Sequence, residues 1–467
     1  MLTKRGGLLT VLGVALILFS LSFYAIRDFA YFVGEITKID LREFLPNIMN
    51  LIYLSPAFIL IGALILSSVI FSFTSFQQIM RPDYIEIKRK ISSDRCFAGD
   101  LVTVTLEIRN KSPFWLNNVF ISDILPDVFD LSFGENFIII NLPPKKKIEL
   151  SYVIRCSTRG VYKIGPIQLV LQDKAGLFMK NFLIEKYTEI RVYPSYEDIR
   201  RFETLMRAYG SILFGRYRVR ERGHGYDFWG LRKYQPTDSI RFIDWKASAR
   251  RGELYIKEYE AERNVKMYIF LDASSSMGLG HKRMTKIDYA ARVCVLLSYL
   301  ANRAQDFFGL VVFSDNIRDF IPARRGKKHF YKILEALARA EAHGASNLTQ
   351  AMREFIKRER RAALAFIISD LEGDFSSIEE GIKIALSNKV WPIIIAPIGP
   401  LFEILPNGEL TKAFFEVALT EYMRRRDQLK LRLAKYGVKV LDVGPEEILG
   451  ISLEAFLKAK GRGIRMM

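Results

Sequence analysis

Two long stretches near the start of the chain carry no charged residue. They are Gly7–Ile26 and Leu54–Phe73, and each contains 20 residues. At about 1.5 Å per residue, a helix of this length crosses a hydrocarbon core of about 30 Å. A cleaved signal peptide is the alternative for the first stretch, but its apolar run is too long, no A-x-A site follows, and a second apolar stretch comes next. We therefore predict a transmembrane hairpin within residues 1–81.

Between residues 82 and 196 the hydrophobic pattern has a period of two. In 101–108 (LVTVTLEI) and 148–155 (IELSYVIR), apolar residues alternate with polar ones, as in strands with one buried face. Short alternating strands with no helical stretch predict an all-β sandwich of immunoglobulin size. Turn sequences separate the strands at 110–113, 125–127, 142–147 and 158–160.

Residues 263–445 show a third pattern, in which continuous apolar runs alternate with amphipathic segments. Uniformly apolar strands separated by helices predict a parallel sheet covered on both faces, which is a doubly wound α/β fold. A basic linker at 197–262 precedes this domain, and a C-terminal helical tail at 446–467 follows it. The apolar runs are 265–272, 307–313, 364–369, 390–398 and 438–443, and helices are expected near 285–304, 328–341 and 347–360, after 370, and through Lys435.

The charge distribution predicts how the hairpin is oriented. The loop 27–50 carries three basic and four acidic residues, whereas the outer flanks of both apolar stretches are basic. The positive-inside rule therefore places both ends in the cytoplasm, with the body of the chain after about residue 82. We expect a multi-pass protein of the cell membrane with cytoplasmic domains. The flanking basic residues are Lys4, Arg5, Arg81, Lys88, Arg89 and Lys90.

The net charge is +18, and one segment contributes +8 of it. Between Arg200 and Lys257 there are 14 Lys and Arg residues against 6 Asp and Glu residues. Such a segment can contact nucleic acid or acidic lipid. Nucleic-acid binding rests on charge alone and predicts a steep salt dependence. We favour proximity to anionic lipid headgroups and do not expect nucleic acid as a partner.

Polar side chains follow the first apolar strand of the α/β segment. Residues 271–277 read LDASSSM, so Asp272, Ser274 and Ser276 occupy alternate positions and face the same way. In doubly wound sheets, ligands bind just beyond the carboxyl ends of the strands. Asp370 ends a second apolar run, and Ser346 precedes a helix. These hard oxygen donors suit Mg²⁺, with Mn²⁺ or Ca²⁺ as alternatives.

Each of these residues alone has a structural explanation, because Ser and Asp commonly cap helices. Together, Asp272-x-Ser274-x-Ser276, Ser346 and Asp370 resemble the metal-ion-dependent adhesion site of von Willebrand factor type A domains. The resemblance implies that these five residues hold one divalent cation, and that an acidic side chain of a partner completes its coordination. Ser346 stands where that family has Thr, which keeps the hydroxyl oxygen.

A wider resemblance covers most of the part that follows the hairpin. The segment 225–250 (GYDFWGLRKYQPTDSIRFIDWKASAR) and the tract 157–178 are similar to the domain-of-unknown-function-58 family. Members of that family are often membrane-anchored, with a β-sandwich ahead of a type A domain, and the resemblance implies partnership with MoxR-type AAA+ ATPases. Thr237 stands where the family usually has Gly. The charged and aromatic residues of the signature, which form either a structural network or a second recognition surface, are Asp238, Arg241, Asp244, Trp245 and Arg250.

These observations predict a membrane-anchored, non-enzymatic module whose bound metal docks an Asp or Glu of a partner protein. The competing class is a Mg²⁺-dependent phosphoryl-transfer enzyme with Asp272 as nucleophile. That chemistry usually needs a second acid two residues later, where this chain has Ser274. The chain also lacks the phosphate-loop pattern G-x-x-x-x-G-K-[ST], the G-x-S-x-G elbow and the H-E-x-x-H zinc motif.

Overall fold

A computed structural model describes the chain at residues 2–37, 46–79, 81–195, 218–223, 227–236, 238–264, 266–281, 284–402 and 409–461. The chain divides into two compact units. The first consists of Met1–Asp94, Leu101–Arg155 and Tyr162–Ile190. The second consists of Arg95–Asp100, Cys156–Val161 and Arg191–Met467. The two units are described separately below.

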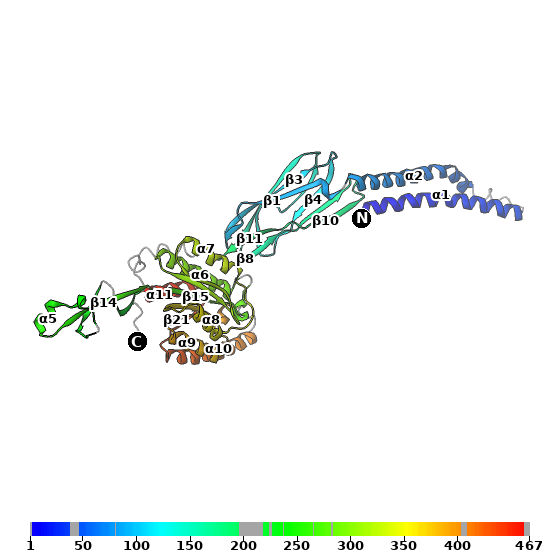
Figure 1. Cartoon of the computed structure of the whole chain (residues 1–467). Coiled ribbons are helices and arrows are strands. Elements are labelled where there is room, and N and C mark those ends of the chain that lie inside the picture. Colours follow the sequence, from blue (N-terminus) through cyan, green and yellow to red (C-terminus); the bar gives the residue numbers. More distant parts are fainter. Residues whose placement is uncertain are drawn as a thin grey trace. The chain divides into compact units, whose positions relative to one another are not determined.

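The first unit begins with two long helices that pack against each other (Figure 1). α1 spans Lys4–Thr37 and α2 spans Pro46–Ile79. The segments Lys4–Val33 and Tyr53–Ile79 are long and apolar enough to cross a membrane. Most of their large side chains face outward, as expected for helices surrounded by lipid. Their length and composition indicate membrane association.

Small residues bring the two helices together. A Cβ atom on Gly62 would lie 2.8 Å from the carbonyl oxygen of Gly13 and 2.7 Å from the side chain of Ile17. Further along, the buried Ser20 hydroxyl donates to the Ser55 carbonyl at 2.7 Å. Close backbone approach and interhelical hydrogen bonds are typical of helix pairs within membranes. The helices therefore form a specific hairpin.

The rest of the first unit is built mainly from two four-stranded sheets, β1-β3-β7-β5 and β10-β9-β4-β6. Alternate residues of β3, among them Leu106 and Ile108, meet Leu169 and Leu171 of β9 in one buried cluster. The period-two pattern predicted this β-sandwich, and the structure confirms it. The strands of these two sheets are β1 (Ile85–Ile91), β3 (Leu101–Asn110), β4 (Leu116–Asp123), β5 (Phe129–Phe133), β6 (Phe137–Leu142), β7 (Lys147–Cys156), β9 (Ile167–Gln172) and β10 (Met179–Ile184). The second unit contains β2 (Arg95–Phe97), which pairs in parallel with the last three residues of β11 (Thr188–Tyr193).

The described part of the predicted linker is folded. β14 (Tyr255–Asn264) is the central strand of a three-stranded antiparallel ribbon, with β12 (Arg218–Gly223) on one side and β13 (Asp227–Lys233) on the other. A short helix, α5 (Trp245–Arg251), precedes β14. Thr237 and residues 196–217 of the basic segment lie outside the described residues.

The main body of the second unit is a six-stranded sheet in the order β19-β18-β15-β20-β21-β22. Five strands are parallel, as predicted. The sixth strand, β19, was not predicted and runs antiparallel to β18 at the edge, so the sheet is mixed and not wholly parallel. The strands are β15 (Lys266–Asp272), β18 (Phe308–Phe313), β19 (Ile317–Arg324), β20 (Ala363–Ile368), β21 (Val390–Pro397) and β22 (Val440–Val443).

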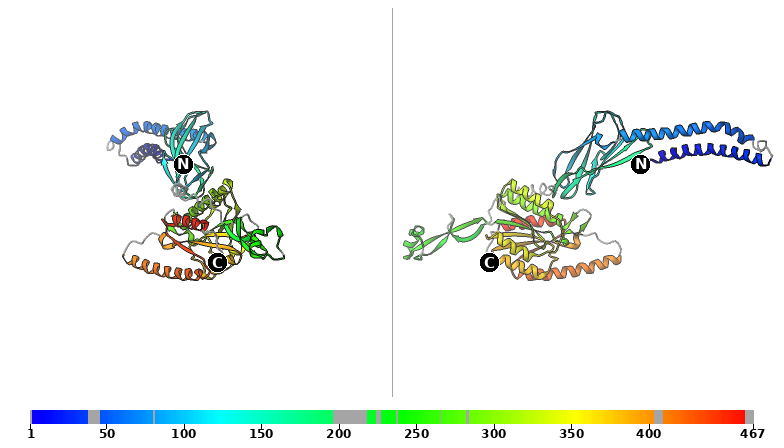
Figure 2. Two further views of the ribbon diagram at one scale, coloured as in Figure 1. Left: turned by 90° about the vertical axis from the view of Figure 1, so that its left-hand side faces the viewer. Right: turned by 45° about the vertical axis from the view of Figure 1, so that its right-hand side comes forward.

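Helices cover both faces of this sheet (Figures 1 and 2). Alternate residues of β15 divide between two buried clusters: Ile269 and Leu271 pack toward α6, α7 and α11, whereas Tyr268 and Phe270 pack toward α8, α9 and α10. Burial on both faces explains why the strand reads as a continuous apolar run. The helices are α6 (Lys286–Arg303), α7 (Lys327–Arg339), α8 (Leu348–Arg358), α9 (Phe375–Ser387), α10 (Glu409–Ala434) and α11 (Ile448–Gly461).

The last helix is part of this domain. Phe456 of α11 is wholly buried in the same cluster as α6, and its ring lies 6.3 Å from that of Phe366 in β20. Lys460, near the end of the helix, forms a buried ion pair with Asp306 at 2.7 Å. The α/β domain therefore extends beyond residue 445 through α11, the segment predicted as a separate tail.

Candidate functional site

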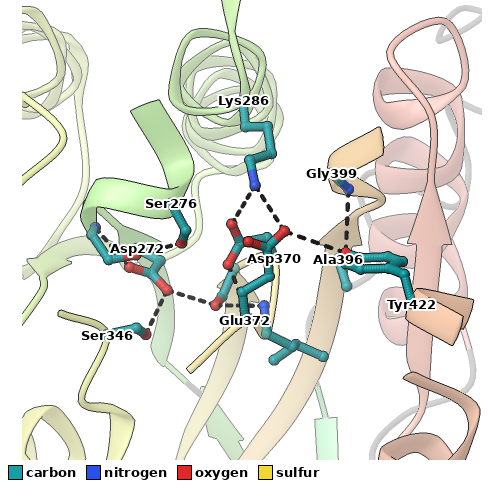
Figure 3. Close-up of polar contacts among 12 residues, drawn as sticks. Asp272, Ser276, Lys286, Ser346, Asp370, Glu372, Ala396, Gly399 and Tyr422 are labelled. Atoms are coloured by element: carbon teal, nitrogen blue, oxygen red, sulfur yellow. Dashed lines mark hydrogen bonds and ion pairs between the residues drawn. The ribbon is translucent and has the colours of Figure 1, made fainter. Parts of the chain in front are cut away.

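The carboxylate of Asp272 lies at the centre of a cluster of hydroxyl groups (Figure 3). Asp272 is the last residue of the central strand β15 and is wholly buried. Its Oδ1 accepts a hydrogen bond from the backbone N–H of Ser274 at 2.9 Å, and its Oδ2 accepts one from the Ser346 hydroxyl at 2.7 Å. Residues 74 positions apart in the sequence therefore meet at the carboxyl end of the sheet, as the motif predicted.

The serines after Asp272 divide into two groups. The hydroxyl oxygens of Ser274 and Ser276 lie 3.2 Å apart, whereas Ser275 between them is exposed. A 3₁₀ turn over Ser275–Gly278 follows the strand and gives the segment this alternation. Ser274 and Ser276 therefore contribute their oxygens to one point, and Ser275 offers a matched control position in the same turn.

Ser369 was not predicted. It follows β20, and its hydroxyl donates to Oδ2 of Asp272 at 2.6 Å. The only sequence signal was its position next to Asp370 at the end of an apolar run. Within the described ranges, the groups that donate to the Asp272 carboxylate are all neutral: the Ser274 N–H and the hydroxyls of Ser346 and Ser369.

The burial of Asp272 makes its negative charge costly. Burial is the largest cause that raises the pKa of Asp272, and the nearby Asp370 carboxylate raises it further. The hydrogen bonds from Ser369, Ser346 and Ser274 act in the opposite direction, and burial outweighs them. A buried carboxylate is stable when a cation lies beside it. Burial therefore favours the protonated form of Asp272 unless a cation lies beside the carboxylate.

Asp370 differs from Asp272 because it already has a counter-ion. The ammonium of Lys286, the first residue of α6, lies 2.6 Å from Oδ2 of Asp370 and 2.9 Å from Oε1 of Glu372. Lys286 and Asp370 are both wholly buried. Burial lowers the pKa of Lys286, but the two carboxylates outweigh it, so the net direction is upward and the side chain stays charged.

The backbone between Asp370 and Glu372 is strained. Leu371 has a φ of 57°, a left-handed conformation that is unusual for a bulky residue. This turn lets Asp370 and Glu372 both face Lys286 (Figure 3). The buried Arg426 of α10 donates to the Asp370 carbonyl at 2.9 Å and to the Ala396 carbonyl at 2.7 Å, which holds the turn against β21. Lys286, Glu372 and Arg426 had no recognisable motif, because their roles depend on contacts between distant elements.

A cavity of about 270 Å³ opens beside the acidic turn. Glu372, Phe375, Tyr422 and Arg425 contribute to its lining. The side chain of Glu372 is 28% exposed, so one edge of the ion-pair cluster reaches this cavity. The cavity combines an apolar wall with charges of both signs and can accommodate a side chain of another molecule.

The residues around Asp272 fit a hard divalent cation. One buried carboxylate and the hydroxyls of Ser274, Ser276 and Ser346 are oxygen donors of the kind that Mg²⁺ accepts. Within the part of the chain that the structure describes, no group of three or more His, Cys, Asp or Glu residues is placed to hold a metal, so a site here depends on the hydroxyls. The fifth predicted ligand, Asp370, faces Lys286.

The predicted signature residues do not form one network. Asp238 accepts two hydrogen bonds from Arg232, at 2.6 and 2.5 Å, and Arg232 lowers the pKa of Asp238. Asp244 caps the N-terminus of α5 through the N–H groups of residues 246 and 247, and the bond from residue 247 is the largest cause that lowers its pKa. Arg241, Trp245 and Arg250 are exposed. The two acids therefore stabilise the ribbon, and the other three side chains face solvent.

Comparison with known proteins confirms the family resemblance. Residues 230–394 match the family model described as "Protein of unknown function DUF58". YeaD of Bacillus subtilis (strain 168) is 26% identical over 300 residues, which cover 63% of this chain and 73% of YeaD. The matched family segment contains the ribbon strand β14, the Asp272 site and β20.

Solved structures also align with this chain. BatB from Bacteroides thetaiotaomicron is 14% identical, with a TM-score of 0.29, and the alignment covers 42% of this chain and 99% of BatB. The SpRpn10 VWA domain is 15% identical, with a TM-score of 0.26, and the alignment covers 41% of this chain and 94% of that domain. The sheet order and the helices on both faces give this chain a von Willebrand factor type A-like domain, as predicted.

Proposed function

We propose that this chain is a membrane-anchored, divalent-metal-dependent docking module that binds an acidic side chain of a partner protein. The observation that carries the proposal is the wholly buried Asp272 carboxylate, which is surrounded by hydroxyls at the carboxyl end of the central strand. Asp272, Ser274, Ser276 and Ser346 would hold the ion, with Mg²⁺ preferred and Mn²⁺ or Ca²⁺ as alternatives. The bound ion would supply a positive charge with room for one more carboxylate oxygen.

The chain's own residues prepare this site. Ser369 and Ser346 orient the Asp272 carboxylate, and the Lys286 ammonium neutralises Asp370 so that the two acids do not repel each other strongly. The cavity beside Glu372 lies next to this cluster and can receive a residue that flanks the partner's acid. Opposite charges at short range in a partly dry site make one partner residue dominant for affinity.

The family resemblance supports a MoxR-type AAA+ ATPase as the partner, acting in protein maturation or complex assembly at the cytoplasmic face of the membrane. The phosphoryl-transfer alternative has no support from the geometry. That chemistry usually needs a second acid two residues after the nucleophile, and this chain has Ser274 there, whose hydroxyl lies 3.2 Å from that of Ser276. We therefore propose a binding role and not an enzymatic one.

The proposal is tested with the full-length protein captured from membranes in Mg²⁺ or in EDTA. Wild type should retain its partner in Mg²⁺ and release it in EDTA, and the Ser274→Ala/Ser276→Ala variant should lose most of the capture. The Ser275→Ala variant is the matched control, because Ser275 is exposed in the same turn. Capture that persists in EDTA, or that Ser275→Ala abolishes equally, would contradict the proposal. Calorimetric titration of the same variants with Mg²⁺ separates loss of the metal from loss of the partner.

A further inference from the structure

Two exposed aromatic residues lie in the loop between β3 and β4. Phe114 is 46% exposed and Trp115 is 57% exposed. Single exposed apolar residues are ordinary on protein surfaces. An adjacent Phe and Trp, held in fixed positions beside a membrane anchor, are a different case, because Trp concentrates at the boundary between lipid and water.

The loop is held by two buried polar residues. The Asn110 side chain donates to the carbonyls of Phe114, Leu142 and Pro143 at 2.8, 3.1 and 3.1 Å. Both the N–H and the hydroxyl of Ser112 donate to Oδ1 of Asn110, at 2.9 and 2.7 Å. Asn110 and Ser112 are almost fully buried, so these hydrogen bonds are strong constraints on the loop. The fold therefore fixes the backbone of the loop at Phe114, and the side chains of Phe114 and Trp115 are exposed from it.

The loop lies at the end of the sandwich that joins the apolar helices. The N–H of Lys111 donates to the carbonyl of Tyr84 at 2.7 Å, and Tyr84 is the fifth residue after the end of α2. On the other side of Trp115, the Asn118 amide lies 3.5 Å from the Asp173 carbonyl. The Asp173 carboxylate in turn accepts a hydrogen bond from Ser72 of α2 at 2.8 Å. At about 3.3 Å per residue, Trp115 is within roughly 10 Å of Asn118, and Asp173 connects Asn118 to the helix.

Basic side chains border the aromatic pair. Lys145 and Lys146 are exposed in the β6–β7 turn, whose Lys146 carbonyl accepts a hydrogen bond from the Asn110 N–H at 3.0 Å. Acids at this end of the sandwich pair with other lysines: Lys111 lies 3.3 Å from Glu86, and Lys147 lies 2.8 Å from Glu149. The patch is therefore aromatic at its centre, with two lysines beside it that form no ion pair within the described part of the chain.

We propose that this patch, consisting of Phe114, Trp115, Lys145 and Lys146, binds the surface of the bilayer that α1 and α2 enter. The two aromatic side chains enter the interfacial layer, and the two lysines contact the phosphates of anionic phospholipids. The Asn118–Asp173–Ser72 contacts connect the patch to α2, and its charge is complementary to that of an anionic leaflet. The contact fixes the tilt of the sandwich on the membrane. It depends on membrane association and not on the metal site.

The test uses the full-length protein in vesicles of phosphatidylcholine and phosphatidylglycerol with bromine atoms placed near the headgroups. Bromine quenches a tryptophan that reaches the interface. The chain has 4 Trp residues, so the contribution of Trp115 is the difference between wild type and Trp115→Phe. We expect the quenched component to disappear in Trp115→Phe and to persist in Trp391→Phe, because Trp391 lies within the α/β core.

A second experiment tests whether the charges of Lys145 and Lys146 contribute to membrane binding. Lys145→Gln/Lys146→Gln, or vesicles of phosphatidylcholine alone, should reduce the quenching, with each neutralised lysine changing the partition of the loop roughly five-fold. Quenching that Trp115→Phe leaves unchanged would overturn the proposal. So would a Trp115→Phe variant that shifts the oligomeric state of the reconstituted protein without altering quenching, since the occupant of the patch would then be a second copy of the chain.

Discussion

Replacing Lys286 by Met tests whether the buried ammonium is the permanent counter-ion of Asp370. Met keeps most of the length of the side chain and removes its charge. The ammonium lies 2.6 Å from Asp370 and 2.9 Å from Glu372, and both Lys286 and Asp370 are wholly buried. Removing one partner of a buried ion pair leaves an uncompensated charge and costs about 3–5 kcal/mol. We expect a loss of this size in the free energy of unfolding.

The measurement is denaturant unfolding of the full-length protein in EDTA, with the signal taken from the α/β domain. Lys327→Met is the matched control, because Lys327 is also the first residue of a helix, is exposed, and should change stability by no more than about 0.5 kcal/mol. The double variant Lys286→Met/Asp370→Asn should recover much of the loss, since it removes both charges together.

The effect of Mg²⁺ on the stability of Lys286→Met provides a second test of this prediction. Without Lys286, the acids Asp272 and Asp370 both lack a counter-ion, so Mg²⁺ should stabilise Lys286→Met more than it stabilises wild type. The reasoning is refuted if Lys286→Met unfolds at the same denaturant concentration as Lys327→Met. It is also refuted if the double variant is less stable than Lys286→Met alone.

Two further predictions concern packing and pH. Gly309→Ala should lower the free energy of unfolding by about 1–3 kcal/mol, because its Cβ would lie 2.5 Å from the carbonyl of Ile321. Gly450→Ala should not destabilise the fold, because a Cβ at this position would meet no atom within 4 Å. Thermal unfolding compares the two variants. Burial lowers the pKa of His329 below its ordinary value of 6.5. When the pH falls below about 6.5, the unfolded chain therefore binds a proton at His329 before the folded chain does. The stability that this group contributes above pH 6.5 should therefore be lost as the pH falls, and His329→Gln should flatten the dependence of the denaturation midpoint between pH 8 and pH 5.

The elements that could be predicted from the sequence are those whose burial is either uniform or regularly periodic. Residues of β15 and β20 face helices on both sides, and α1 and α2 face lipid, so each reads as an unbroken apolar run. The edge strand β19 could not be predicted in this way. Its residues are half-buried or exposed, and it contains Pro322, so its sequence (IRDFIPAR) has no clear period. Its neighbour β18 determines its position.

The residues of the candidate metal site also divide into those that a regular sequence pattern predicts and those that only tertiary packing brings together. Asp272, Ser274 and Ser276 could be predicted because the alternation of a strand is enough to place them together. Ser369 and Lys286 could not be predicted, since they reach the acids only after the sheet and α6 have packed. The sequence indicates which oxygen donors are near a strand end, but the charges that compensate them come from tertiary contacts.

The compensating charges decide what the site can bind. Counting acids in the motif predicts two carboxylates for one cation. Among the residues that the structure describes, Asp370 is bound to the ammonium of Lys286, whereas Asp272 is bound by neutral donors alone. The strands β15 and β20 are adjacent, and the acids at their ends therefore differ in whether a positive charge of the chain compensates them. An external cation would gain most by binding at Asp272, where the contacts from the described residues are all neutral. A cation at Asp370 would have to displace Lys286, which burial makes costly to move. The proposed metal affinity thus depends on one carboxylate and its hydroxyls, and a carboxylate supplied by a partner would strengthen both metal binding and docking.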